Sequence, residues 1–311
     1  MKLNQFMNIW LNKYAKHTIK LRTYVNYKAI IDNHISPKLG NYEMKDISSS
    51  LIQDFIIRKL EKGNLKNGNA LAYNTINAIF TVLKQVLKCA YNLEEITKDI
   101  TNKITLPPVK EKKIEVFDLN EQKRLEKYCL SHKNNYFGII LCLYTGMRIG
   151  ELLALEWNDI DFNKRLININ KSVCTIKING KFTFYVDTPK TKSSLRIIPI
   201  PKQLILFLKK IKHNSNSNFI ITTRHNTMVG TRSYQRTYAN ALKKLGITYR
   251  NFHSLRHTFA TRALELGIDV KSLSEILGHK SAVTTLNRYS HSLLSYKYEM
   301  MNKLGKNIFC Q

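Results

Sequence analysis

The sequence has few cysteines, few acidic residues and no long apolar run. No stretch approaches the ~20 apolar residues of a membrane-spanning helix, and no signal peptide is visible, so we expect a cytoplasmic protein without membrane contacts. The absence of a C-x-x-C pair argues against zinc knuckles and a disulfide framework. The cysteines are widely scattered: Cys89, Cys129, Cys142, Cys174 and Cys310.

Basic residues far outnumber acidic ones in the sequence. The 311 residues include 50 Lys and Arg but only 22 Asp and Glu, a formal net charge of +28. The excess runs along the whole chain and indicates a polyanionic partner. Because helical periods are regular and 10% of residues are aromatic, a disordered basic linker is excluded. A folded nucleic-acid-binding protein is favoured, although a compositional bias of the source genome is another origin for some of the lysines.

The first third of the chain predicts a small all-α bundle. At 311 residues, the length suggests two domains. Apolar residues recur at three- and four-residue steps over residues 19–34, and Pro37 and Gly40 are expected to end that helix. Ser48 and the two serines after it offer caps for a helix over residues 51–60.

A linker and a second domain follow the bundle. Residues 71–91 carry the last strong helical period, and we assign residues 1–105 to the helical bundle. Pro107 and Pro108 prevent a helix in residues 106–116, which we assign to a linker. The remaining residues, 117–311, form the second domain with a C-terminal tail.

The second domain mixes helices with a small antiparallel β-sheet. Asp118 and Glu121 have the spacing of a capping box, and an apolar period continues through Leu125, Cys129 and Leu130. Short alternating runs follow from residue 166: LININ, KSVCTIKI, KFTFYVD and LRIIPI. An Asn-Gly pair joins the second and third runs, which predicts a hairpin. The fold class is therefore mainly α with a small antiparallel sheet.

Arg148 and Glu151 form the first candidate cluster, within TGMRIGEL. Three residues apart at the start of a helix, they share one face. A guanidinium held by a carboxylate is rigid enough to grip two oxygens of a phosphate. The alternative is an ordinary surface ion pair.

His253 and Arg256 form the second cluster, in FHSLRHTFAT. Their spacing makes them neighbours on a helix, where an imidazole could transfer a proton and a guanidinium neutralise an anionic transition state. A capped helix with incidental basic residues is the alternative. The next residue, His257, is expected to cap or pack.

The remaining candidates are weak singly but informative together. They are His279, expected to be exposed after a helix-ending glycine, Tyr289 at the end of a short helix, and Lys190 or Lys192 in a basic turn. With the two arginines they complete a set suited to phosphoryl transfer through a phosphotyrosine. No P-loop motif or acidic cluster for two magnesium ions accompanies them, so ATPases and metal-dependent nucleases lose support.

The order of these motifs resembles that of the tyrosine recombinases, the lambda-type phage integrase family, especially integrases of conjugative transposons and Gram-positive phages. The motifs are TGMRIGEL, TPKTKSSLRIIPI, FHSLRHTFAT, LGHKS and TTLNRYSH, with I-x-P-x-L-G at residues 35–40 in the first domain. The resemblance implies a SAM-like core-binding bundle and a mixed α/β catalytic domain. The additional arm-site-binding domain of larger integrases is not expected in this sequence.

The resemblance also implies a role for each candidate. Arg148 and Arg256 would bind the scissile phosphate, Tyr289 would be the nucleophile and Glu151 would support the first arginine. Lys190, preferred to Lys192, would protonate the leaving 5′ hydroxyl. His253 and His279 would assist proton transfer.

The resemblance further implies a site-specific recombinase that needs no metal, ATP or other cofactor. Its expected partner is double-stranded DNA at core-type attachment sites in the nucleoid, with a homotetramer on synapsed DNA and an excisionase or DNA-bending factor as an accessory. The alternatives are a type IB topoisomerase-like or hairpin-resolving enzyme, and a noncatalytic DNA-binding regulator.

Overall fold

The computed structural model describes residues 1–65, 67–108, 114–132, 135–178, 180–187, 195–279, 281–289, 298, 301–302 and 304–305. The chain divides into two compact units. The first is Met1–Lys112 with Ile176–Lys181, and the second is Lys113–Thr175 with Phe182–Gln311. Residues 109–113 of the predicted linker lie outside the described residues.

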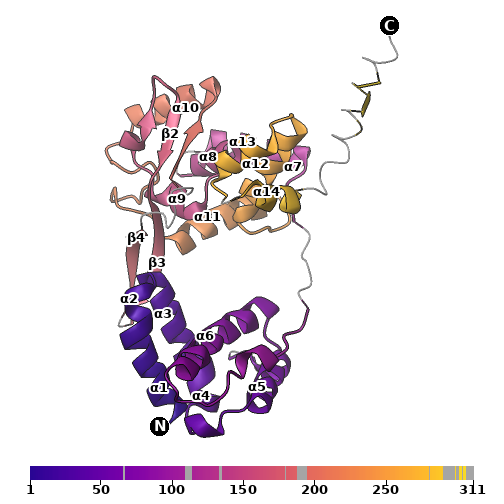
Figure 1. Ribbon diagram of the computed structural model, residues 1–311. Coiled ribbons are helices and arrows are strands. Elements are labelled where there is room, and N and C mark those ends of the chain that lie inside the picture. The colour runs from indigo at the N-terminus through magenta and orange to yellow at the C-terminus, as the bar shows by residue number, and fades with distance from the viewer. Residues whose placement is uncertain are drawn as a thin grey trace. The chain divides into compact units, whose positions relative to one another are not determined.

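The first unit is a bundle of helices (Figure 1). Its α-helices are α1 (Leu3–Ile9), α2 (Lys16–Thr18), α3 (Leu21–Ile30), α4 (Ser36–Leu39), α5 (Ser49–Lys62) and α6 (Tyr73–Asn92). Two π-helical segments, Trp10–Ala15 and Ile31–Ile35, and two 3-10 turns, Met44–Asp46 and Thr101–Lys103, complete it. Helix α6 packs against α3 and α5, and the core between them includes Phe6, Ile35 and Leu83.

Two local sequence signals bear on helix boundaries in this unit, and one of them misled. The Ser48 side chain accepts a hydrogen bond from the Leu51 backbone N–H at 3.2 Å, so it caps α5 as expected. The expectation that Pro37 ends the preceding helix was wrong. Pro37 lies in the first turn of α4, where a missing N–H is tolerated, and the helical path ends at Gly40.

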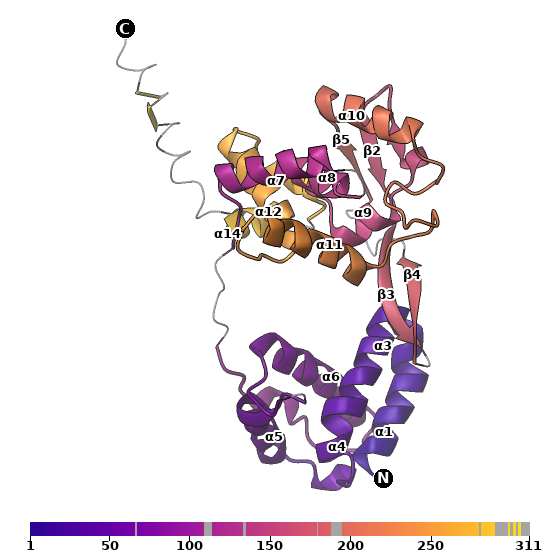
Figure 2. The same ribbon diagram turned by 180° about the vertical axis from the view of Figure 1, so that it is seen from behind.

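The second unit combines helices with a small sheet that lies at one side of them (Figure 2). Its α-helices are α7 (Leu119–Ser131), α8 (Phe137–Thr145), α9 (Ile149–Ala154), α10 (Lys202–His213), α11 (Thr231–Lys244), α12 (His253–Glu265), α13 (Val270–Leu277) and α14 (Ala282–Tyr289), with a 3-10 turn at Trp157–Asp159. Helices α8 and α12 lie side by side in its centre, so the residues at the ends of α8 come close to those on α12.

The strands form two small sheets. Strands β1 (Ile160–Asp161), β2 (Leu166–Ile169) and β5 (Arg196–Pro199) form an antiparallel sheet in the order β1-β2-β5. Strands β3 (Ser172–Ile178) and β4 (Lys181–Asp187) pair separately. The register sets Ile169 opposite Arg196, at the start of β5. The predicted fold class, mainly α with small antiparallel sheets, is confirmed.

The start of α7 shows how sequence determines a local structure here. The Asp118 carboxylate accepts from the Glu121 backbone N–H at 2.8 Å, and Glu121 accepts from the Asp118 N–H at 3.0 Å. This is the expected capping box. Leu125 and Cys129 are buried, but Leu130, expected on the same apolar face, is exposed.

Candidate active site

The first part of the site lies where α8 ends and α9 begins. Helix α8 ends at Gly146, whose φ of +63° lies in the left-handed region, and α9 starts directly after Arg148. Glu151 accepts hydrogen bonds from the Arg148 backbone N–H at 2.8 Å and from its guanidinium at 2.7 Å. The i,i+3 contact anticipated from the sequence is therefore present. It joins a carboxylate that is 7% exposed to an arginine side chain that is 38% exposed.

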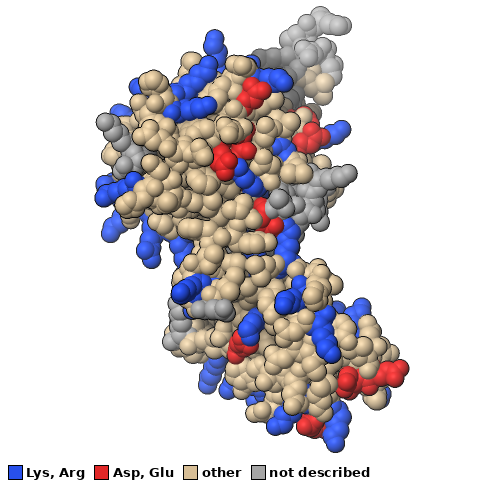
Figure 3. All heavy atoms as spheres, turned by 90° about the vertical axis from the view of Figure 1, so that its left-hand side faces the viewer, with Lys and Arg blue, Asp and Glu red and all other residues tan. Residues whose placement is uncertain are grey.

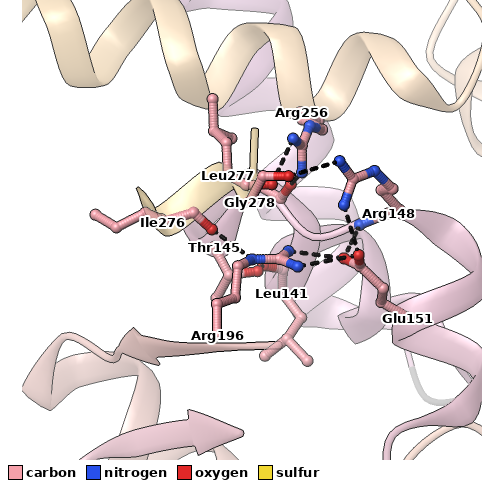
Figure 4. Close-up of polar contacts among 10 residues, drawn as sticks. Leu141, Thr145, Arg148, Glu151, Arg196, Arg256, Ile276, Leu277 and Gly278 are labelled. Carbon is pink, nitrogen blue, oxygen red and sulfur yellow. Dashed lines mark hydrogen bonds and ion pairs between the residues drawn. The ribbon is translucent and has the colours of Figure 1, made fainter. Parts of the chain in front are cut away.

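A second arginine, which sequence reasoning missed, binds the same carboxylate. Arg196 donates from Nη1 and Nη2 to the two oxygens of Glu151 at 3.0 and 2.7 Å. Its Nε donates to the carbonyl of Ile276 at 2.6 Å, and Figure 4 shows the side chain stretched between the two acceptors. The fork of a guanidinium matches a carboxylate in this way, so Glu151 is shared by two arginines.

These arginines keep Glu151 ionised. Burial by itself raises the pKa of the carboxyl group, but the hydrogen bonds and positive charge of Arg196, together with those of Arg148, outweigh burial and lower the pKa to about 2. A carboxylate with this pKa stays negative at any physiological pH. It is therefore a fixed acceptor that orients Arg148.

Arg256 occupies the centre of the site. Its side chain comes from the first turn of α12 and is only 2% exposed. Nη1 donates to the carbonyl of Gly146 at 2.8 Å, and Nη2 donates to the carbonyl of Leu277 at 2.6 Å. Arg148 donates to the next carbonyl, that of Gly278, at 3.3 Å. Both arginines are thus fixed by consecutive carbonyls where α13 ends (Figure 4).

The cluster carries more positive than negative charge. Arg148 and Arg196 pair with the carboxylate of Glu151, while the guanidinium group of Arg256 is bound by backbone carbonyls (Figure 4). Burial, and then the charge of Arg148, lower the pKa of Arg256 to about 9, although Glu151 acts in the opposite direction. Arg256 remains protonated at neutral pH. An anion bound here would relieve the repulsion among the arginines.

Tyr289 lies at the end of α14 and is buried, with 2% of its surface exposed. Its hydroxyl is 2.7 Å from Nδ1 of His257, the residue that follows Arg256 on α12. The His257 ring also meets the ring of His253 edge to face, with centroids 4.7 Å apart. Sequence reasoning expected His257 only to cap or pack. Instead it links the tyrosine hydroxyl to the helix that carries Arg256.

The other predicted residues lie in different surroundings. His279 was expected to be exposed, but it is half-buried, and its Nδ1 is 2.7 Å from the hydroxyl of buried Thr285. Lys190 and Lys192 fall in residues 188–194, between β4 and β5, and so lie outside the described residues.

The described residues can also be searched for membrane-spanning helices, metal-binding groups and charged surfaces. Within the described part of the chain, no helix is long and apolar enough to cross a membrane, and no group of three or more His, Cys, Asp or Glu is arranged to hold a metal ion. On the face drawn in Figure 3, Lys and Arg side chains outnumber Asp and Glu and are scattered over both units.

Comparison with known proteins defines the class of the protein. Residues 115–295 match the Phage integrase family, and residues 2–60 match the phage integrase N-terminal SAM-like domain. The first match alone covers more than half of the chain. The chain therefore belongs to the phage integrase family, the tyrosine recombinases, and is a site-specific DNA strand-exchange enzyme. The family resemblance of the motifs is confirmed.

The similar sequences include a tyrosine recombinase, an integrase and a transposon transposase. A XerC-like tyrosine recombinase of Caldanaerobacter subterraneus is 30% identical, with 97% of this chain and 82% of that protein aligned. The ICEBs1 integrase of Bacillus subtilis is 29% identical, with 90% and 77% aligned. The Tn916 transposase of Enterococcus faecalis is 28% identical, with 93% and 74% aligned.

Solved structures share the fold. The Tn1549 transposon integrase in complex with a circular intermediate DNA has a TM-score of 0.82 at 22% identity, covering 97% of this chain and 99% of that one. A lambda integrase dimer bound to a COC′ core site has a TM-score of 0.68 at 20% identity, covering 91% and 97%.

Proposed function

We propose that Tyr289 is the nucleophile of this recombinase and that Arg148 and Arg256 hold the phosphate it attacks. The tyrosine oxygen forms a bond to phosphorus, the bond from phosphorus to the 5′ oxygen breaks, and a 3′-phosphotyrosyl link remains. Attack by the 5′ hydroxyl of another strand reverses the step. Because one phosphodiester bond replaces another, no ATP is consumed, and the arginines supply the charge that a metal would otherwise provide.

The other residues would move protons and hold the arginines in place. Lys190, or Lys192 if the turn is shifted, protonates the departing 5′ oxygen. His253 and His279 hydrogen-bond the phosphate and assist proton transfer, and Glu151 orients Arg148. To these we add His257, whose Nδ1 is within hydrogen-bonding distance of the Tyr289 hydroxyl and can receive its proton.

The 2.7 Å contact between Tyr289 and His257 carries this proposal. It ties the hydroxyl to the residue next to Arg256, which in turn shares the end of α13 with Arg148. Any buried tyrosine hydroxyl is expected to have a hydrogen-bond partner, and what supports a catalytic role is that this partner is a histidine next to Arg256.

The test is covalent capture on a nicked attachment-site substrate, followed by denaturing electrophoresis. The natural chain should form a protein–DNA adduct, also in the presence of a metal chelator, and Tyr289→Phe should form none while still binding DNA. Tyr249→Phe, which changes an exposed tyrosine of the same unit, is the control and should react normally. An adduct with Tyr289→Phe would eliminate Tyr289 as the nucleophile.

The proposed partner is duplex DNA at core-type attachment sites. The Tn1549 integrase and lambda integrase were solved with DNA, and a lambda integrase tetramer was solved on a Holliday junction. We propose the same kind of assembly here, a homotetramer on synapsed DNA in the nucleoid of the cytoplasm, with an excisionase or DNA-bending factor setting direction. Relaxation of supercoils without synapsis would instead favour topoisomerase-like religation of the same strand.

A further inference from the structure

The first unit contains a cavity of about 300 Å³ that the recombination chemistry does not use. It lies between the end of α4 and one face of α5, both labelled in Figure 1. Its walls combine apolar and aromatic side chains, among them Phe55 and Tyr42, with four basic ones. A volume of this size is at the lower end of that typical of small-molecule sites.

Among the described residues, the basic side chains of this cavity have no acidic partner. They are Lys38, Arg58, Lys59 and Lys62. Asp54 and Glu61 also line the cavity. Among the ion pairs of the described residues, however, neither carboxylate lies within 4.0 Å of any of the four cations. Cations on helix surfaces commonly pair with carboxylates three or four residues away. Here they surround an open space instead.

Lys59 is the most informative of the four. It is only 7% exposed, and its ammonium group lies 5.5 Å from the centre of the Phe55 ring. Burial, and then the charge of Lys38, lower the pKa of its amine. A lysine that served only packing would extend its amine to water along its apolar stem or meet a carboxylate. The ammonium group of a largely buried lysine beside another cation is stabilised when an anion binds.

We propose that this cavity binds a small phosphate-bearing molecule of nucleotide size. Lys59, Lys38 and Arg58 contact the phosphate, and the aromatic faces of Phe55 and Tyr42 cover the attached ring. Phosphate suits a cluster of several cations, because its oxygens accept many charge-assisted hydrogen bonds. A backbone phosphate of duplex DNA fits less well, since it belongs to a broad, rigid surface and Lys59 is only 7% exposed.

The experiment is calorimetric titration of the full chain with inorganic phosphate and with AMP, at an ionic strength matched by sodium chloride. We expect saturable binding of one AMP per chain, with weaker binding of inorganic phosphate. Lys59→Met removes the charge and keeps the stem, and it should weaken AMP binding by roughly tenfold to a hundredfold. Lys13→Met, at an exposed lysine of the same unit, should bind AMP normally.

Thermal unfolding without ligand separates a binding role from a structural one. If Lys59 awaits an anion, ligand-free Lys59→Met should unfold at the same or a higher temperature than the natural chain, since it loses an uncompensated charge. A lower unfolding temperature, or no AMP binding beyond that of chloride, would overturn the proposal. Displacement of bound AMP by duplex DNA would assign the cavity to the DNA interface and would also overturn the proposal. None of these outcomes depends on Tyr289 as nucleophile.

Discussion

Replacing Glu151 with glutamine should destabilise the second unit at neutral pH and release Arg148. Glu151 is buried and accepts hydrogen bonds from Arg148 and Arg196 through both carboxylate oxygens. Glutamine has nearly the same shape, but it loses the negative charge and presents an NH₂ donor toward guanidinium donors. The two arginines would then lie close together without a counter-charge.

The size of the effect follows from the pKa of the carboxyl group. Its fall from 4.5 to about 2 in the folded protein corresponds to about 3.4 kcal/mol of stability at pH 7. Because the folded pKa is depressed, this contribution is complete above pH 4.5 and is lost as the pH falls toward 2. At pH 3 about 1.4 kcal/mol should remain.

Denaturant unfolding of both proteins between pH 7 and pH 3 measures this difference. Each unit has one tryptophan, Trp10 in the first and Trp157 in the second. In a Trp10→Phe background, fluorescence follows the second unit alone, which avoids mixing two transitions. Subtracting one protein from the other removes the titration of all other carboxylates. The difference should shrink from about 3.4 to about 1.4 kcal/mol.

A control at a partly exposed ion pair shows whether the loss of stability depends on the burial of Glu151 or only on losing an ion pair. Glu265 pairs with Arg262 at 2.6 Å, but both side chains are partly exposed, at 34% and 22%. Glu265→Gln should therefore cost less than ~1 kcal/mol. Equal stability of Glu151→Gln and the natural chain at pH 7, or a difference that does not change down to pH 3, would refute the reasoning.

Two further changes test the backbone and the tyrosine partner. Gly146→Ala should lower stability by more than about 1 kcal/mol, because φ is +63° and the added Cβ would lie 2.5 Å from the Phe259 ring. Covalent capture should slow as well, since the Gly146 carbonyl holds Arg256. A variant with a normal melting temperature and a normal capture rate would contradict this prediction. His257→Phe keeps an aromatic ring but removes the partner of Tyr289, so adduct formation in single-turnover capture should slow by about a hundredfold or more if His257 is the base, with DNA affinity unchanged. An unchanged rate across pH would limit His257 to packing.

Much of the fold could be predicted because its signals are local. The Ser48 cap, the capping box at Asp118 and the Asn-Gly turn each depend on a few adjacent residues, and the structure has helices or strands where they indicate them. Pro37 misled because proline is compatible with the first turn of a helix, and nothing in the sequence showed that a new helical segment starts at Ser36. Helical periodicity likewise could not distinguish buried Leu125 from exposed Leu130.

The site was predictable only where its contacts are also local. The pair of Arg148 and Glu151 follows from i,i+3 spacing, whereas Arg196 reaches Glu151 from 45 residues further along the chain. The one sequence signal for Arg196 was a charged residue at the start of an apolar strand, and such residues usually face water. Only the packing of β5 beside α13 brings its guanidinium to the carboxylate.

Arg196 changes how the role of Glu151 should be understood. A buried carboxylate paired with Arg148 alone would have one counter-charge, on an arginine side chain that is 38% exposed, and this would compensate poorly for its burial. Arg196, whose side chain is 5% exposed, holds Glu151 from the buried side and leaves Arg148 on the open side. Through Glu151, the position of Arg196 on β5 fixes the orientation of Arg148. Arg148 is the more exposed of the two arginines assigned to the phosphate. Arg196→Met should therefore impair DNA cleavage more than DNA binding, because Arg196 contacts Glu151 and the Ile276 carbonyl and acts on Arg148 through the carboxylate.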